Sequence, residues 1–178
     1  MHHKIKSALD QKDEENFLSL FKNGYEISAA SKNGVNALTH CIMTYNLKML
    51  KFVIKNTNID LNALYSKSNS IHETFKKPQP GINIAIYMKK KIMVKLLLDA
   101  GASIEHKDTF SLAFKELTDI DTIETIVSKS DSNQLENYQK FIEKFPDNDL
   151  KSKTNKIIQN YELGLNVEEK PKQKTMKI

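Results

Sequence analysis

The hydrophobic pattern is clearest between residues 92 and 108, which read IMVKLLLDAGASIEHKD. Five of the six residues in 93–98 are apolar, a stripe too wide for a helix that faces a single neighbour. Gly101 then permits the left-handed backbone conformation in which many helices end. After it, apolar and polar residues alternate as far as Glu105, and a period of two indicates extended chain. The stretch predicts a helix packed on two sides, a glycine stop and an extended segment.

The same order of features recurs along the chain. Residues 17–29, FLSLFKNGYEISA, have Gly24 as their stop, and residues 47–63 have Thr57 in the place of the glycine. Ser130 marks a weaker fourth stop. The residues three positions before the four stops are Phe21, Ile54, Leu98 and Val127, at spacings of 33, 44 and 29 residues. Self-similarity at a fixed period indicates a repeat architecture, here with one insertion and one deletion.

Two segments, LLLDAGASIEHKD and NGVNALTHCI, resemble the ankyrin repeat of about 33 residues, which has a tip, an inner helix and a leucine-rich outer helix. The positions that match its inner-helix pattern are Gly34, Asn36, Ala37, Leu38 and Cys41 in one repeat and Ile82, Asn83, Ile84 and Ala85 in the next. The resemblance covers about residues 5–130. It implies an all-α fold, an ankyrin-type α-solenoid of helix-turn-helix repeats with capping helices at both ends.

The resemblance and the spacings together predict one domain over residues 1–163. Its parts are an N-terminal cap at 4–29, repeats at about 30–63, 76–107 and 108–130, an inserted loop at 64–80, and C-terminal helices within 132–163, followed by a flexible Lys-rich tail at 164–178. The predicted helices are 4–9, 13–22, 37–44, 47–55, 82–88, 92–100, 110–117, 122–129, 134–145 and 149–163. Asp13 is the expected N-cap of the second helix.

Composition narrows the class of protein. The chain has 178 residues, of which 39% are hydrophobic and 28% charged, which is enough for one continuous core in a soluble domain. No run of eighteen apolar residues occurs, and the first residues are too polar for a secretory signal. Cys41 is the single cysteine, so no internal disulfide can form. We therefore expect a cytoplasmic protein, with secretion into a host cell left open.

Candidate catalytic and metal-binding chemistry is sparse. His40 and Cys41 could suggest a base and a nucleophile, but both match the packed interior of an inner helix, so Cys41 is expected to be a core thiol. A zinc site needs three or four converging ligands, and no such spacing occurs. The paired acids lie at predicted helix starts, where they stabilise the helix. We expect no catalytic residues, no metal, no cofactor and no small-molecule substrate, and hence no enzyme.

Charge indicates the kind of partner. The net charge is +5 and all 27 basic residues are lysines. Residues 73–95 hold six lysines and one glutamate. Lysine lacks the planar fork with which arginine reads guanine edges. An acidic protein partner therefore fits better than sequence-specific nucleic acid.

The ankyrin resemblance implies a protein-binding module or adaptor that uses its tip loops and the concave face of its inner helices, and that acts as a monomer. In AT-rich bacterial genomes such modules also resemble host-directed effectors. The positions that vary in the family and would contact the partner are Lys32, Asn33, Val35, Met43, Thr44, Lys76, Lys77, Gln79, Tyr87 and Met88. The alternative is a lysine-driven binder of nucleic acid or other polyanions, with an affinity that collapses as salt rises.

Overall fold

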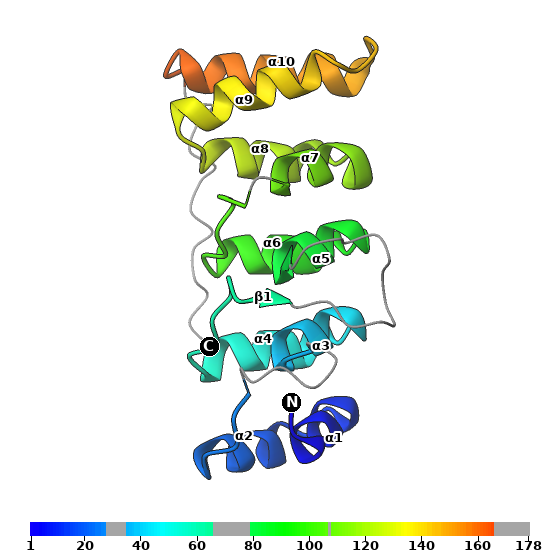
Figure 1. Cartoon of the computed structure of the whole chain (residues 1–178), viewed down its shortest axis with the longest axis vertical. Coiled ribbons are helices and arrows are strands. Elements are labelled where there is room, and N and C mark those ends of the chain that lie inside the picture. Colours follow the sequence, from blue (N-terminus) through cyan, green and yellow to red (C-terminus); the bar gives the residue numbers. More distant parts are fainter. Residues whose placement is uncertain (28–34, 66–78, 107, 166–178) are drawn as a thin grey trace, which may run out of the picture. The chain divides into compact units, whose positions relative to one another are not determined.

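A computed structural model describes residues 1–27, 35–65, 79–106 and 108–165, and these residues are mostly helical (Figure 1). The all-α prediction is confirmed at this level. The chain divides into two compact units, Met1–Leu117 and Thr118–Ile178. The single domain expected over 1–163 stays a prediction.

The first unit contains α1 (His3–Gln11), α2 (Glu14–Lys22), α3 (Ala37–Met43), α4 (Leu47–Asn56), β1 (Leu64–Tyr65), β2 (Gln79–Pro80), α5 (Gly81–Tyr87), α6 (Lys91–Asp99), α7 (Thr109–Leu112) and the π-helical segment η1 (Ala113–Leu117). The second contains α8 (Ile120–Ser128), α9 (Ser132–Ile142) and α10 (Asp149–Glu162). Most predicted helix bounds agree within two residues. The π-helical turn was not predicted, and α9 ends at Ile142 instead of Phe145.

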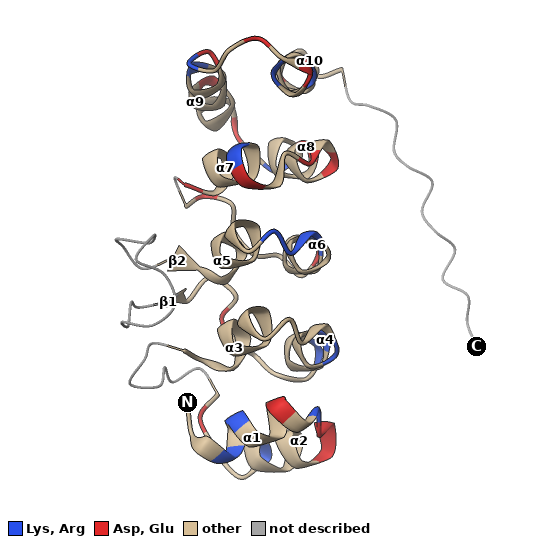
Figure 2. Ribbon diagram, turned by 90° about the vertical axis from the view of Figure 1, so that its right-hand side faces the viewer, with Lys and Arg blue, Asp and Glu red and all other residues tan. Residues whose placement is uncertain are grey.

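The helices of the first unit are arranged in pairs. In each of the pairs α1–α2, α3–α4 and α5–α6 the two helices contact each other. Between pairs, α1 contacts α3, α3 contacts α5, and α5 contacts α7 and η1. Figure 2 shows α1, α3 and α5 following one another on one side, with α2, α4 and α6 on the other. The first member of each pair is therefore called the inner helix below.

The inner helices α3 and α5 are buried on most of their surface because each lies between two others. All six residues from Gly81 to Ile86 are buried, as are all six from Ala37 to Ile42. In α6 the four buried side chains are Met93, Val94, Leu97 and Leu98. Leu96 is half-buried and α5 is the helix that α6 contacts most, so the packing of α6 on two sides stays a prediction. Beyond Gly101, Ala102 and Ile104 are buried and Glu105 is exposed, although no strand forms there.

The helix stops work in two ways. Gly24 and Gly101 have φ of +82° and +90°, which an L-residue adopts only with strain, so both glycine stops are confirmed. Thr57 keeps an extended backbone, and its hydroxyl donates to the Val53 carbonyl oxygen at 2.7 Å. Ser130 similarly donates to Ile126 at 2.8 Å. A hydroxyl thus satisfies a terminal carbonyl where glycine is absent.

A second set of left-handed residues lies in the turns that lead into α2, α4, α6 and α8. Lys12, Tyr45, Lys89 and Thr118 have φ of +58°, +53°, +57° and +51°. The next residue is the N-cap of the following helix in each case. Asp13, Asn46 and Asp119 cap with their side chains, whereas Lys90 makes no such bond.

The ends of the predicted 64–80 insertion pair with each other. β1 and β2 are antiparallel, with Leu64 opposite Pro80 and Tyr65 opposite Gln79. Residues 66–78, which form the rest of the insertion, lie outside the described residues, as do the tip at 31–34 and residues 166–178 of the tail.

In the second unit, α10 contacts both α8 and α9. Its buried residues are Thr154 and Ile158, and Leu150, Ile157 and Tyr161 are half-buried. The three helices pack through α10, which contacts the other two, and α8 contributes Ile123, Ile126 and Val127 as buried side chains.

Candidate partner-binding surface

The predicted partner-contacting residues fall into three groups. Lys32, Asn33, Lys76 and Lys77 lie outside the described residues. The other six lie at opposite ends of the inner helices α3 and α5. A seven-residue helix is about 10 Å long, so these two groups do not converge on one site.

At the N-terminal end of the inner helices, Val35 is half-buried and Gln79 is 4% exposed. The Gln79 side chain is held from both directions. Its amide nitrogen donates to Asp108 at 3.4 Å, and its oxygen accepts from Asn83 at 2.7 Å. The expectation that Gln79 contacts a partner gains no support from this placement, because little of the side chain reaches solvent. Its β2 pairing, which the sequence did not predict, is the reason.

At the C-terminal end, Met43, Tyr87 and Met88 are half-buried and Thr44 is exposed. The Thr44 hydroxyl donates to the His40 carbonyl at 2.9 Å. These four residues precede the left-handed turns at Tyr45 and Lys89. Since α3 contacts α5, the two turns belong to neighbouring helix pairs.

The structure adds an interaction there that the sequence did not predict. The Lys90 ammonium lies 4.4 Å from the centroid of the Tyr45 ring, within the range of a cation–π contact. Tyr45 is 48% exposed and Ile92 is 56% exposed. We call Tyr45, Lys89, Lys90, Lys91 and Ile92 the turn-edge patch. The KKKI run was visible in the sequence, but nothing there placed Tyr45 against it.

One lysine of the turn-edge patch lies near an acid of η1. Lys89 lies 4.0 Å from Glu116, at the limit of an ion pair. Figure 2 shows the basic run at the turn into α6. In the α3–α4 pair, Lys48 lies 3.2 Å from Glu14 of α2.

A buried amide joins α5 to the chain that follows α6. Asn83 is fully buried, and its amide nitrogen donates to Gln79 at 2.7 Å and to Nδ1 of His106 at 3.1 Å. Its oxygen accepts from the Thr109 hydroxyl at 2.8 Å. Because an amide N–H can only donate, Nδ1 of His106 is the acceptor in this contact. This arrangement is structural and offers no group to a ligand.

The pair His40 and Cys41 forms no nucleophilic dyad. His40 donates through Nε2 to the Asp10 carboxylate at 2.6 Å, and Lys6 donates to the other oxygen at 2.6 Å. Burial alone would raise the pKa of Asp10, but these two hydrogen bonds outweigh it and lower that pKa below its ordinary value. Burial raises the pKa of the Cys41 thiol to about 12. The thiol is therefore protonated at neutral pH, as expected for a core cysteine.

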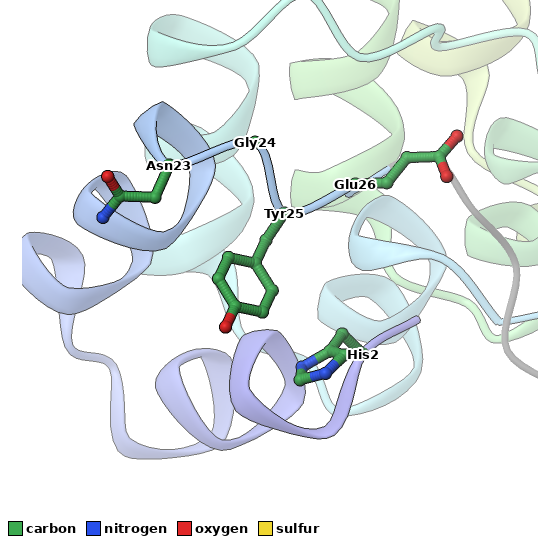
Figure 3. A pocket seen from close by; sticks show the side chains of 5 residues that line it. All are labelled: His2, Asn23, Gly24, Tyr25 and Glu26. Atoms are coloured by element: carbon green, nitrogen blue, oxygen red, sulfur yellow. The ribbon is translucent and has the colours of Figure 1, made fainter.

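An open pocket of about 460 Å³ lies beside the N-terminus, lined by His2, Asn23, Gly24, Tyr25 and Glu26. His2 and Tyr25 meet edge to face at 4.8 Å, and the Lys4 ammonium lies 5.8 Å from the same ring. In Figure 3 the side chains of Asn23 and Glu26 point away from each other and from Tyr25. The pocket lacks converging polar groups, which a ligand site needs.

Within the described ranges, no three side chains among His, Cys, Asp and Glu come together as a metal site would require. No helix of those ranges combines the length and hydrophobicity needed to cross a membrane. Comparison with protein-family models and with curated proteins found no match to this chain.

Proposed function

We propose that the chain is a divergent ankyrin-type repeat module that binds a partner protein. The observation that carries this proposal is the recurrence of a left-handed turn residue at positions 12, 45, 89 and 118. The spacings are 33, 44 and 29 residues, the same as those between the outer-helix positions 21, 54, 98 and 127. Each outer-helix position follows its turn by nine residues. Backbone and side-chain pattern thus repeat together.

The contacts of the first unit support the same proposal. Each inner helix contacts the next inner helix, and α2 contacts α4. Such contacts are expected where each repeat buries the apolar side of the neighbouring repeat. Stacked repeats present long surfaces of variable side chains, and such surfaces bind proteins. Cys41 is a buried thiol, and Asn83 and His40 are held by hydrogen bonds inside the fold. We therefore assign all three residues a structural role.

The test is affinity capture with the tagged full chain as bait, in lysates of the source cell and of candidate host cells. The variant combines Lys76→Glu, Lys77→Glu and Tyr87→Ala. We expect it to keep the thermal unfolding curve of the parent and to lose the captured protein, because aromatic groups and complementary charge dominate protein recognition. The matched control is Lys51→Glu with Lys55→Glu, two exposed lysines of α4.

Equal recovery by the triple variant and the parent would contradict a role for Lys76, Lys77 and Tyr87 in partner binding. Retention on heparin that disappears at moderate salt, with no protein captured, would instead favour the polyanion-binding alternative.

A further inference from the structure

The turn-edge patch carries residues whose identity local structure does not explain. Tyr45 and Lys89 occupy left-handed positions with φ of +53° and +57°. An L-residue there is strained by about 1–2 kcal/mol relative to the right-handed region, and glycine is not. The same conformation recurs at Lys12 and Thr118, so the strain belongs to the turn and does not by itself explain the choice of side chain. The Tyr45 ring is half exposed, so burial does not account for its presence.

Lys90 is also unexpected at its position. The equivalent N-cap residues of the other outer helices are Asp13, Asn46 and Asp119, whose side chains accept a hydrogen bond from the helix. Lys90 cannot accept one, and the first turn of α6 holds no acid. A cation at this end opposes the helix dipole. The lysine instead reaches across to the Tyr45 ring of the neighbouring pair.

Apolar surface and positive charge meet at this edge. Of the five large apolar side chains that are exposed among the described residues, Tyr45 and Ile92 belong to the patch. Lys90 lies against the Tyr45 ring, and Lys91 directly precedes Ile92 in the chain. Glu116 lies 4.0 Å from Lys89.

We propose that the turn-edge patch docks an acidic segment of a partner protein, one in which carboxylates flank a large apolar side chain. This rests on the proposed protein-binding function and assigns it a surface and a partner chemistry. The carboxylates would pair with Lys89 and Lys90, and the apolar group would pack on Ile92 and the exposed part of the Tyr45 ring. The patch offers both positive charge and apolar side chains, so we expect its ligand to carry both carboxylates and a large apolar group.

A protein segment fits the patch better than other polyanions. A nucleic acid would use the lysines and the ring but would leave Ile92 without an apolar contact. An acidic membrane binds amphipathic surfaces with a broad apolar face, and two apolar side chains provide a narrow one. Ile92 is therefore the residue that separates the three possibilities.

The experiment measures fluorescence anisotropy of a labelled short peptide in which glutamates flank two leucines, titrated with the full chain. A polyglutamate peptide of equal charge is the reference. We expect the leucine peptide to bind about tenfold more tightly than polyglutamate. Lys89→Glu with Lys90→Glu should weaken it about tenfold, since each exposed charge contributes modestly. Ile92→Ser should weaken the leucine peptide several-fold and leave polyglutamate unchanged.

The matched control is Lys51→Glu with Lys55→Glu on α4, which makes the same charge change away from the patch and should leave peptide binding unaltered. Circular dichroism melting curves check that all variants stay folded. Peptide binding that ignores the Lys89 and Lys90 changes, or equal affinity for both peptides, would overturn the proposal. Tighter patch-dependent binding of a homopolymeric RNA or of vesicles containing phosphatidylserine would also overturn it.

Failure here is distinguishable from failure of the proposed function. A partner captured equally by the parent and by the Lys89→Glu, Lys90→Glu variant would refute the patch and leave protein binding standing. If no protein is captured by either, the protein-binding function itself fails.

Discussion

Helix α5 has two contrasting neighbours. Toward α3 the contact is apolar and close: a Cβ atom added to Gly81 would lie 3.1 Å from Cδ1 of Ile42 and 3.2 Å from Cδ2 of Leu38. Toward α7 the contact is polar, and Asn83 is hydrogen bonded to Gln79, His106 and Thr109. One short helix therefore joins its neighbours by shape on one side and by a saturated amide on the other.

The difference shows what each kind of contact specifies. Apolar packing depends on volume and tolerates similar side chains if the total volume is kept. A buried amide depends on the presence of each partner, because a group left unpaired loses its solvation without compensation. The hydrogen bonds of Asn83 should therefore restrict which side chains can follow α6. The absence of a side chain at Gly81 should set how closely α3 can approach α5.

The largest expected effect comes from Asn83→Ala. It leaves the buried Thr109 hydroxyl and the side-chain oxygen of Gln79 without their partner, and each buried unpaired group costs about 1–3 kcal/mol. We expect the free energy of unfolding to fall by about 3 kcal/mol, measured by urea denaturation followed by circular dichroism. Thr109→Val in both backgrounds completes a double-mutant cycle. Losses that simply add would show that the two side chains are not coupled.

Gly81→Val should be the next largest change. Branched bulk at 81 must displace Ile42 and Leu38, and overpacking of this kind costs about 1–3 kcal/mol, so we expect a loss of about 2 kcal/mol in the same urea measurement. Gly81→Ala should be nearly neutral, because the atoms it meets are flexible side-chain ends and alanine favours the helix. Adding Ile42→Val should recover part of the Gly81→Val loss. A double variant as unstable as the sum of the two singles would argue against a tight contact here.

Asp10→Asn tests a third contact, in which Asp10 of α1 accepts a hydrogen bond from His40 of α3. This contact involves a charged carboxylate, whereas the Asn83 contact is neutral. The folded-state pKa of Asp10 is lowered, so the carboxylate stabilises the fold above its unfolded pKa of about 4 and this contribution disappears as pH falls below it. The side chain is 40% exposed, so solvent screening keeps the effect under about 1 kcal/mol. We expect the difference in urea midpoint between parent and Asp10→Asn to be larger at pH 6 than at pH 3. A difference independent of pH would exclude the ionic contribution.

Local chemistry explains which features could be predicted from the sequence. Gly24 and Gly101 were predictable as helix stops because a positive φ depends on a single residue. Asp13 was predictable as an N-cap because capping likewise depends on a single side chain. The contact of Tyr45 with Lys90 joins residues far apart in the chain, and nothing in either segment specifies its partner. Gln79 appeared to be a surface residue because its pairing in β2 was unknown. Sequence periodicity located the helix pairs, but not the side chains that connect them.

The smallest expected effect compares two equivalent turns, one between α1 and α2 and one between α3 and α4. Lys12→Gly removes about 1–2 kcal/mol of left-handed strain and adds roughly 0.5–1 kcal/mol of chain entropy to the unfolded state, so we expect a net gain of about 0.5 kcal/mol. Tyr45→Gly relieves the same strain but loses the Lys90 contact, worth about 0.5–1 kcal/mol at an exposed site. Its unfolding free energy should therefore stay near that of the parent. Thermal unfolding of both variants beside the parent measures the difference, and equal stabilisation by the two would show that the Tyr45 ring contributes nothing across the α3–α5 contact.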